Sequence, residues 1–106
     1  MNDSLSRLEA TIRARRSADQ STSYVAKLSA AGRAKIAQKV GEEAIETVIA
    51  AMAGDSAKLT SEAADLIFHL LLLLADGGVS LADVTAELDR REGVSGLAEK
   101  AARKEA

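Results

Sequence analysis

The ten residues from Leu66 to Ala75 are all apolar except His69. They form the second half of a segment, Ser56–Asp76, that follows Gly54-Asp55 and ends before Gly77-Gly78. This pattern predicts a helix whose second half has no polar side and must be covered all round. The run is far shorter than the roughly 20 residues that a membrane span needs. One small chain has too few helices to cover it, so we expect a homodimer or a larger homo-oligomer.

The rest of the chain also favours helices. Its 106 residues include no Pro, Trp or Cys and only one Phe and one Tyr. This composition disfavours a β-sandwich or barrel and excludes disulfides and thiolate chemistry. Apolar spacing and capping residues predict helices that begin at Ser4 and cover about 24–31, 33–53, 56–76 and 80–91. We therefore expect an all-α, four- to five-helix bundle with its core completed by dimerisation. Residues 1–106 would form one domain, with 93–106 as a tail.

Charge and the N-terminal sequence narrow the class of protein. The net charge is −2, which disfavours a broad nucleic-acid-binding surface. The N-terminus is polar and lacks the apolar stretch of a signal peptide. We therefore expect a soluble, cytoplasmic protein that binds neither nucleic acid nor a membrane.

Two of the predicted helices carry carboxylates at the spacing i, i+3. The acids are Glu42, Glu43 and Glu46 in the first helix and Glu62 and Asp65 in the second. Residues three apart lie on one helical face, and the break at Gly54-Asp55 would turn the second helix back along the first. Carboxylates gathered in this way disfavour each other's ionised forms, so the cluster needs a cation.

The simpler alternative is that these acids are ordinary exposed charges. Against it, Glu46 lies within AIETVIAAMA and Asp65 within AADLIFHLL, and an unpaired buried carboxylate costs several kcal/mol. Lys39 can neutralise one acid at most. Mg²⁺, with Mn²⁺ as a substitute, suits oxygen ligands best. With no Cys and no Glu-x-x-His motif, we expect His69 to be a core residue or a hydrogen-bond partner of Asp65 rather than a ligand.

The pattern E-E-x-x-E, followed after 15 residues by E-x-x-D, resembles the all-α nucleoside-triphosphate pyrophosphatase (MazG-like) superfamily. Residues 23–51 and 61–92 and the tail GVSGLAEKAAR narrow this resemblance to the phosphoribosyl-ATP pyrophosphatase family of histidine biosynthesis. The combination of the acids with RREG-x-SG-x-x-EK is specific and covers nearly the whole chain. It implies Mg²⁺-dependent hydrolysis of the α–β phosphoanhydride of phosphoribosyl-ATP, giving phosphoribosyl-AMP and pyrophosphate in the second step of that pathway.

The resemblance also suggests roles for individual residues. The positions that match the metal-binding acids of the superfamily are Glu43, Glu46, Glu62 and Asp65. A carboxylate not fully engaged by metal can accept a proton from the attacking water, and both Glu42 and Glu46 are candidates for this catalytic role. Five basic residues are candidates for holding the outer phosphates, although solvated helix charge explains each one equally well: Lys35, Lys39, Arg33, Arg90 and Arg91.

Two other functions remain open at this point. The chain can instead be a house-cleaning pyrophosphatase that acts on free nucleotides such as dUTP or dCTP. It can also be a non-catalytic helical dimerisation module whose acids are only surface charge.

Overall fold

A computed structural model describes residues 4–93 and 96–105, all of whose regular structure is helical. The helices are α1 (Ser4–Arg15), α2 (Tyr24–Ala31), α3 (Arg33–Met52), α4 (Ser56–Asp76), α5 (Leu81–Arg91) and α6 (Gly96–Glu105). The predicted all-α class is confirmed. The segment predicted only as a tail contains a helix, α6, because it is rich in Ala, Lys, Glu and Arg, which are strong helix formers.

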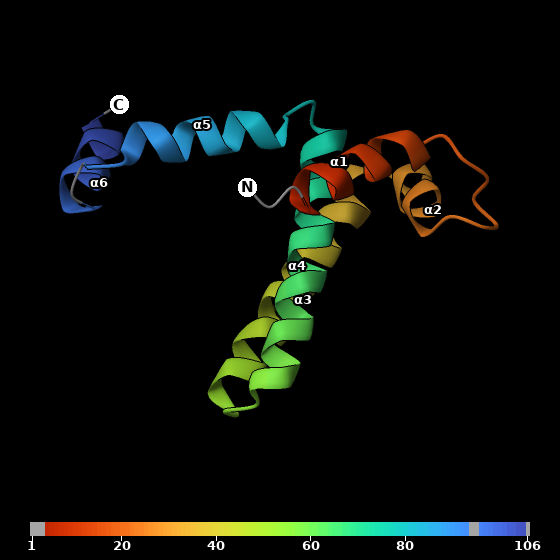
Figure 1. The fold of residues 1–106 in the computed structure, drawn as a ribbon, viewed down its shortest axis with the longest axis horizontal. Helices are drawn as coiled ribbons and strands as arrows, with labels where there is room; N and C mark the ends of the chain where they lie inside the picture. Colours follow the sequence, from red (N-terminus) through yellow and green to blue (C-terminus); the bar gives the residue numbers. More distant parts are fainter. Residues whose placement is uncertain (1–3, 94–95, 106) are drawn as a thin grey trace.

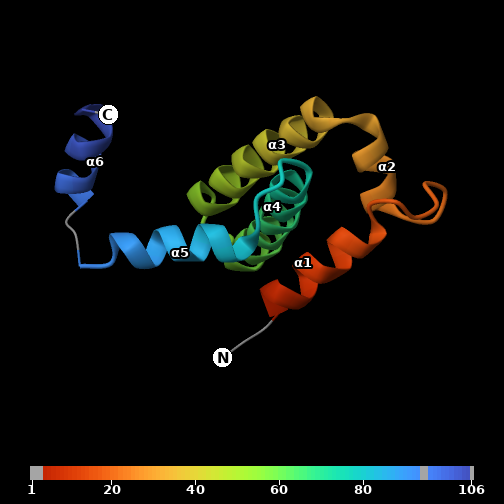
Figure 2. The same ribbon diagram turned by 90° about the horizontal axis from the view of Figure 1, so that it is seen from above.

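The two longest helices, α3 and α4, lie side by side as an antiparallel hairpin (Figures 1 and 2). Gly54 makes the turn with a φ of 73°, which a residue with a side chain rarely adopts. Asp55 then caps α4, because its side chain accepts a hydrogen bond from the backbone N–H of Lys58 at 3.0 Å. This short, capped turn fixes how the acidic faces of the two helices meet.

The buried core lies at one end of the hairpin, where α1 and α2 pack against it (Figure 1). Its members come from all four of these helices: Ile12, Val25, Leu28, Ile36, Leu71, Leu72 and Ala75. Part of the apolar run Leu66–Ala75 is therefore covered by the chain itself. Ile67 and Leu70, on another side of the same helix, remain exposed.

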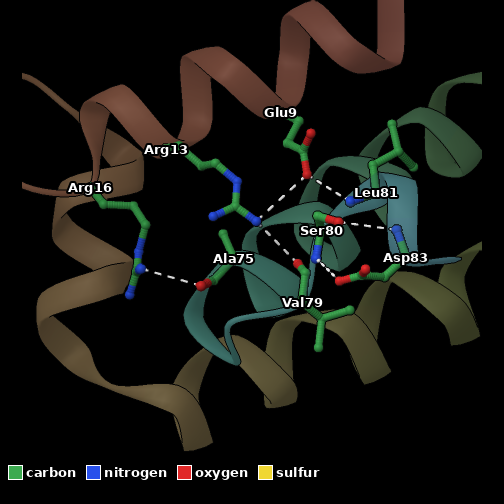
Figure 3. A network of polar contacts seen from close by, with 8 residues as sticks. All are labelled: Glu9, Arg13, Arg16, Ala75, Val79, Ser80, Leu81 and Asp83. Carbon is green, nitrogen blue, oxygen red and sulfur yellow. Dashed lines mark hydrogen bonds and ion pairs between the residues drawn. The ribbon is translucent and has the colours of Figure 1, made fainter.

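A polar network fixes the C-terminal end of α4 and the start of α5 (Figure 3). Arg16 donates to the carbonyl oxygen of Ala75 at 3.3 Å, and Arg13 donates to that of Val79 at 3.1 Å. Guanidinium groups suit this position because the last carbonyls of a helix lack partners within it. Ser80 and Asp83 form the predicted capping box at the start of α5. Helix α5 then leads away from the hairpin (Figure 1).

Within residues 4–93 and 96–105, no single helix has both the length and the apolar character needed to cross a membrane. Helices α4 and α5 reach that standard only when they are taken as a pair, and they are bent by 106° where they join.

Candidate metal centre

Three carboxylates meet across the hairpin. Glu43 comes from α3, and Glu62 and Asp65 come from neighbouring positions on α4. One oxygen from each lies within 4.8 Å of an oxygen from each of the others. Two helices and one tight turn thus bring together three of the four acids that the sequence suggested as metal ligands.

Glu43 is the buried member of this group, with 8% of its surface exposed. Its Oε2 atom is buried and has no hydrogen-bond partner among the described residues. Burial raises the pKa of Glu43 to about 7, helped by a hydrogen bond to Glu46 and by the charges of Glu46, Asp65 and Glu62. Glu46 therefore lies beside Glu43, at the edge of the three-acid group.

This arrangement fits a divalent cation of the hard, oxygen-binding type. The three acids supply carboxylate oxygens at close range, and one buried oxygen has no other partner. A cation bound by the three carboxylates would offset the cost of burying the ionised Glu43 and the repulsion among the acids, both of which raise the pKa of Glu43.

Glu42 is not a member of the three-acid group and is bound by two neighbours on α3. It accepts a hydrogen bond from Gln38 at 2.9 Å and pairs with Lys39, whose Nζ atom lies 3.3 Å away. These two contacts lower the pKa of Glu42. The pKa of Lys39 is raised, first by its hydrogen bond to Glu42 and then by Tyr24 and Glu43. Lys39 is therefore a cation at the rim of the acid cluster.

Comparison with known proteins now identifies the family. Residues 5–92 match the family model described as phosphoribosyl-ATP pyrophosphohydrolase. The chain belongs to the phosphoribosyl-ATP pyrophosphohydrolase family. It is 71% identical over 103 residues, 97% of each chain, to a phosphoribosyl-ATP pyrophosphatase of Rhizorhabdus wittichii. It is 68% identical over 99 residues, 93% of this chain and 92% of the relative, to that of Novosphingobium aromaticivorans.

The matched span contains every candidate residue, but the three candidate phosphate-binding arginines lie apart from the three-acid group. Arg33 binds Asp76 at 2.7 Å, and Asp76 lies about 16 Å beyond Asp65 along α4, at 1.5 Å per residue. Arg90 and Arg91 both bind Glu87, at 2.7 and 2.9 Å, on α5. Lys35 and Lys39 lie nearer to Glu43 along α3, eight and four residues before it, whereas Arg33 lies ten residues before it.

His69 takes the role of a buried core residue, as predicted. It is 6% exposed, and its Nδ1 atom lies 2.7 Å from the backbone carbonyl oxygen of Asp65. Its other nitrogen, Nε2, lies 2.7 Å from the hydroxyl of Tyr24. The contact between Tyr24 and His69 is not predictable from the sequence, because no helical periodicity links the first residue of α2 to the middle of α4.

The raised pKa of Glu43 predicts how the stability of the metal-free protein depends on pH. The carboxyl titrates near its ordinary value of 4.5 when the chain is unfolded and at about 7 when it is folded. Between these values the folded state binds more protons, so stability falls as pH rises from about 4.5 to about 7. We expect the melting temperature in EDTA to fall across this window. Saturating Mg²⁺ should reduce the fall, and the same slope with and without Mg²⁺ would contradict the assignment.

Proposed function

We propose that this chain hydrolyses phosphoribosyl-ATP to phosphoribosyl-AMP and pyrophosphate in histidine biosynthesis, with Mg²⁺ held by Glu43, Glu46, Glu62 and Asp65. The observation that carries the proposal is the buried carboxyl of Glu43, which has one unpartnered oxygen and lies together with two further acids, in a chain of the phosphoribosyl-ATP pyrophosphohydrolase family. When bound, the cation would neutralise phosphate oxygens and lower the pKa of a bound water. Mn²⁺ would substitute for it.

The surroundings of the two candidate bases favour Glu46 over Glu42. Glu42 is held by Gln38 and Lys39, and a carboxylate whose pKa is lowered accepts a proton less readily. Glu46 is exposed and lies beside Glu43 at the edge of the cluster. We therefore assign Glu46 as the general base that accepts a proton from the attacking water. Glu42 instead holds Lys39 at the rim of the acid cluster. There the ammonium group of Lys39 can bind a phosphate of the substrate.

We also propose that the functional unit is a homodimer built on the exposed face of the hairpin. Four residues of α3 at the spacing i, i+3, i+4, i+7 form an apolar stripe with 60–83% of their surface exposed: Ile45, Val48, Ile49 and Met52. Ile67 and Leu70 add exposed apolar surface on α4. Contiguous apolar surface of this kind is typical of a protein–protein interface, and a second copy would also cover the rest of the run Leu66–Ala75.

A pyrophosphate-release assay tests the proposed reaction. We expect release from phosphoribosyl-ATP with Mg²⁺ and none in EDTA, with a kcat/KM at least about 100-fold above that for dUTP, dCTP or ATP. A preference for free nucleotides would instead indicate a house-cleaning pyrophosphatase. No turnover of any of these substrates would leave the non-catalytic dimerisation module as the function.

A further inference from the structure

Tyr24 is an exposed aromatic ring in a chain that has almost none. The sequence contains one Tyr, one Phe and no Trp. Phe68 is partly buried against the core, whereas Tyr24, the first residue of α2, is 47% exposed. A ligand with a flat ring can therefore stack on an aromatic residue of this chain mainly at Tyr24.

The ring of Tyr24 is held in place although it is exposed. It stacks on Phe68, with centroids 6.0 Å apart and planes inclined by 26°. Its hydroxyl oxygen lies 2.7 Å from Nε2 of His69. Phe68 thus covers one face and His69 the hydroxyl end, which leaves the opposite face for solvent. A ring that is already fixed loses little conformational entropy when a ligand stacks on it.

His69 also links this ring to the turn of α4 that carries an acid of the proposed metal centre. Its Nδ1 atom lies 2.7 Å from the backbone carbonyl oxygen of Asp65. Two hydrogen bonds and one imidazole therefore place the hydroxyl oxygen of Tyr24 at most about 8 Å from that carbonyl oxygen. The carboxylate of the same Asp65 belongs to the three-acid group. A mononucleotide, with its phosphate at one end and its base at the other, can span this separation.

The charge beside Tyr24 also suits a phosphorylated ligand. Lys27 is exposed three residues further along α2, so both side chains project from the same side of that helix. Aromatic rings bind nucleic-acid bases by stacking, and a nearby ammonium group binds phosphate. The pair therefore matches the two chemical parts of a nucleotide.

We propose that the exposed face of Tyr24 is the surface on which the adenine base of the substrate stacks. The inference deepens the proposed function and rests on it, because it assigns a site to the base of phosphoribosyl-ATP. The base would lie against the start of α2, with the phosphoanhydride at Glu43, Glu62 and Asp65.

The fluorescence of the protein tests this contact directly, because Tyr24 is the single tyrosine and no Trp is present. We expect phosphoribosyl-AMP to quench the tyrosine emission and the quenching to saturate with the binding measured by calorimetry. Ribose 5-phosphate, which has the phosphate but no base, should not quench. Free N-acetyltyrosinamide, measured in parallel, corrects for light absorbed by the base.

Two substitutions separate stacking from the bond to His69. Tyr24→Leu removes the ring, and we expect KM for phosphoribosyl-ATP to rise by about 10-fold while kcat changes by less than about 3-fold. Tyr24→Phe loses the same hydrogen bond but keeps the ring, so it should recover most of that loss. Melting temperatures in EDTA would show that both variants are folded.

The outcomes distinguish this contact from the proposed reaction. If phosphoribosyl-AMP does not bind, or binds without quenching, the stacking surface is refuted. An equal rise of KM in Tyr24→Leu and Tyr24→Phe would also refute it, because the bond to His69 would then be the cause. Wild-type KM in an active Tyr24→Leu protein would refute the stacking surface and leave the reaction intact. Saturable quenching in a protein that releases no pyrophosphate would support the base site and refute the reaction.

Discussion

Replacing Glu43 with Gln is expected to abolish pyrophosphate release while making the metal-free protein more stable. Glu43 is buried and its pKa is raised to about 7, so the ionised group is held in the folded state at a cost. Gln keeps the shape and removes the charge. At pH 8 we expect the free energy of unfolding in EDTA to rise by about 1–3 kcal/mol. We expect kcat/KM with Mg²⁺ to fall by about 1,000-fold or more, because a ligand of the cation is lost.

The opposite signs of these two effects distinguish a metal ligand from a structural residue. The gain in stability should disappear near pH 4.5, where Glu43 is protonated in the folded wild-type protein. Stabilisation by added Mg²⁺ should be much smaller in the variant than in the wild type. Glu92→Gln, which neutralises an exposed carboxylate just after α5, is the control. It should change neither the free energy of unfolding in EDTA nor kcat/KM with Mg²⁺. A Glu43→Gln protein that is less stable yet fully active would rule out the proposed centre.

Most helix boundaries were predictable because the signals that set them are local. Ser23 caps α2 by accepting from the backbone N–H of Ala26, and Gly32 follows its last residue with a φ of 102°. Ser80 and Asp83 cap α5 in the same local way. The proximity of Glu43 to Glu62 and Asp65 was also predictable, because helical periodicity and one tight turn are sufficient to bring them together.

The directions of the longer side chains were not predictable from the sequence. Glu42 lies one residue from Glu43, and its direction depends on whether it binds Gln38 and Lys39 or joins the cluster. The direction of the Arg33 side chain is set by its hydrogen bond to Asp76, a partner 43 residues away along the chain. Tyr24 meets His69 across 45 residues. Each of these contacts is decided by tertiary packing, for which the periodicity of a single helix contains no information.

The apolar stripe on α3 leads to the second large expected effect. Val48→Asp would place a charge at the centre of the proposed interface, twice in a two-fold dimer, where it would have no partner. We expect the dissociation constant of the dimer to rise by about 1,000-fold or more, since an unpaired buried charge costs several kcal/mol. In an isolated chain the same exposed substitution should change stability by only about 0.5 kcal/mol. Sedimentation velocity at micromolar concentration measures the difference.

Ala10→Asp introduces the same charge at an exposed position of α1, away from the stripe on α3, so it should leave the dimer intact. A wild-type protein that is monomeric at micromolar concentration would refute the dimer, and a dimeric Val48→Asp protein would move the interface away from α3. The acids Glu43, Glu62 and Asp65 come from one chain, so a monomeric Val48→Asp protein should still bind Mn²⁺. Loss of pyrophosphate release in that monomer would then show that catalysis, unlike cation binding, requires the second copy.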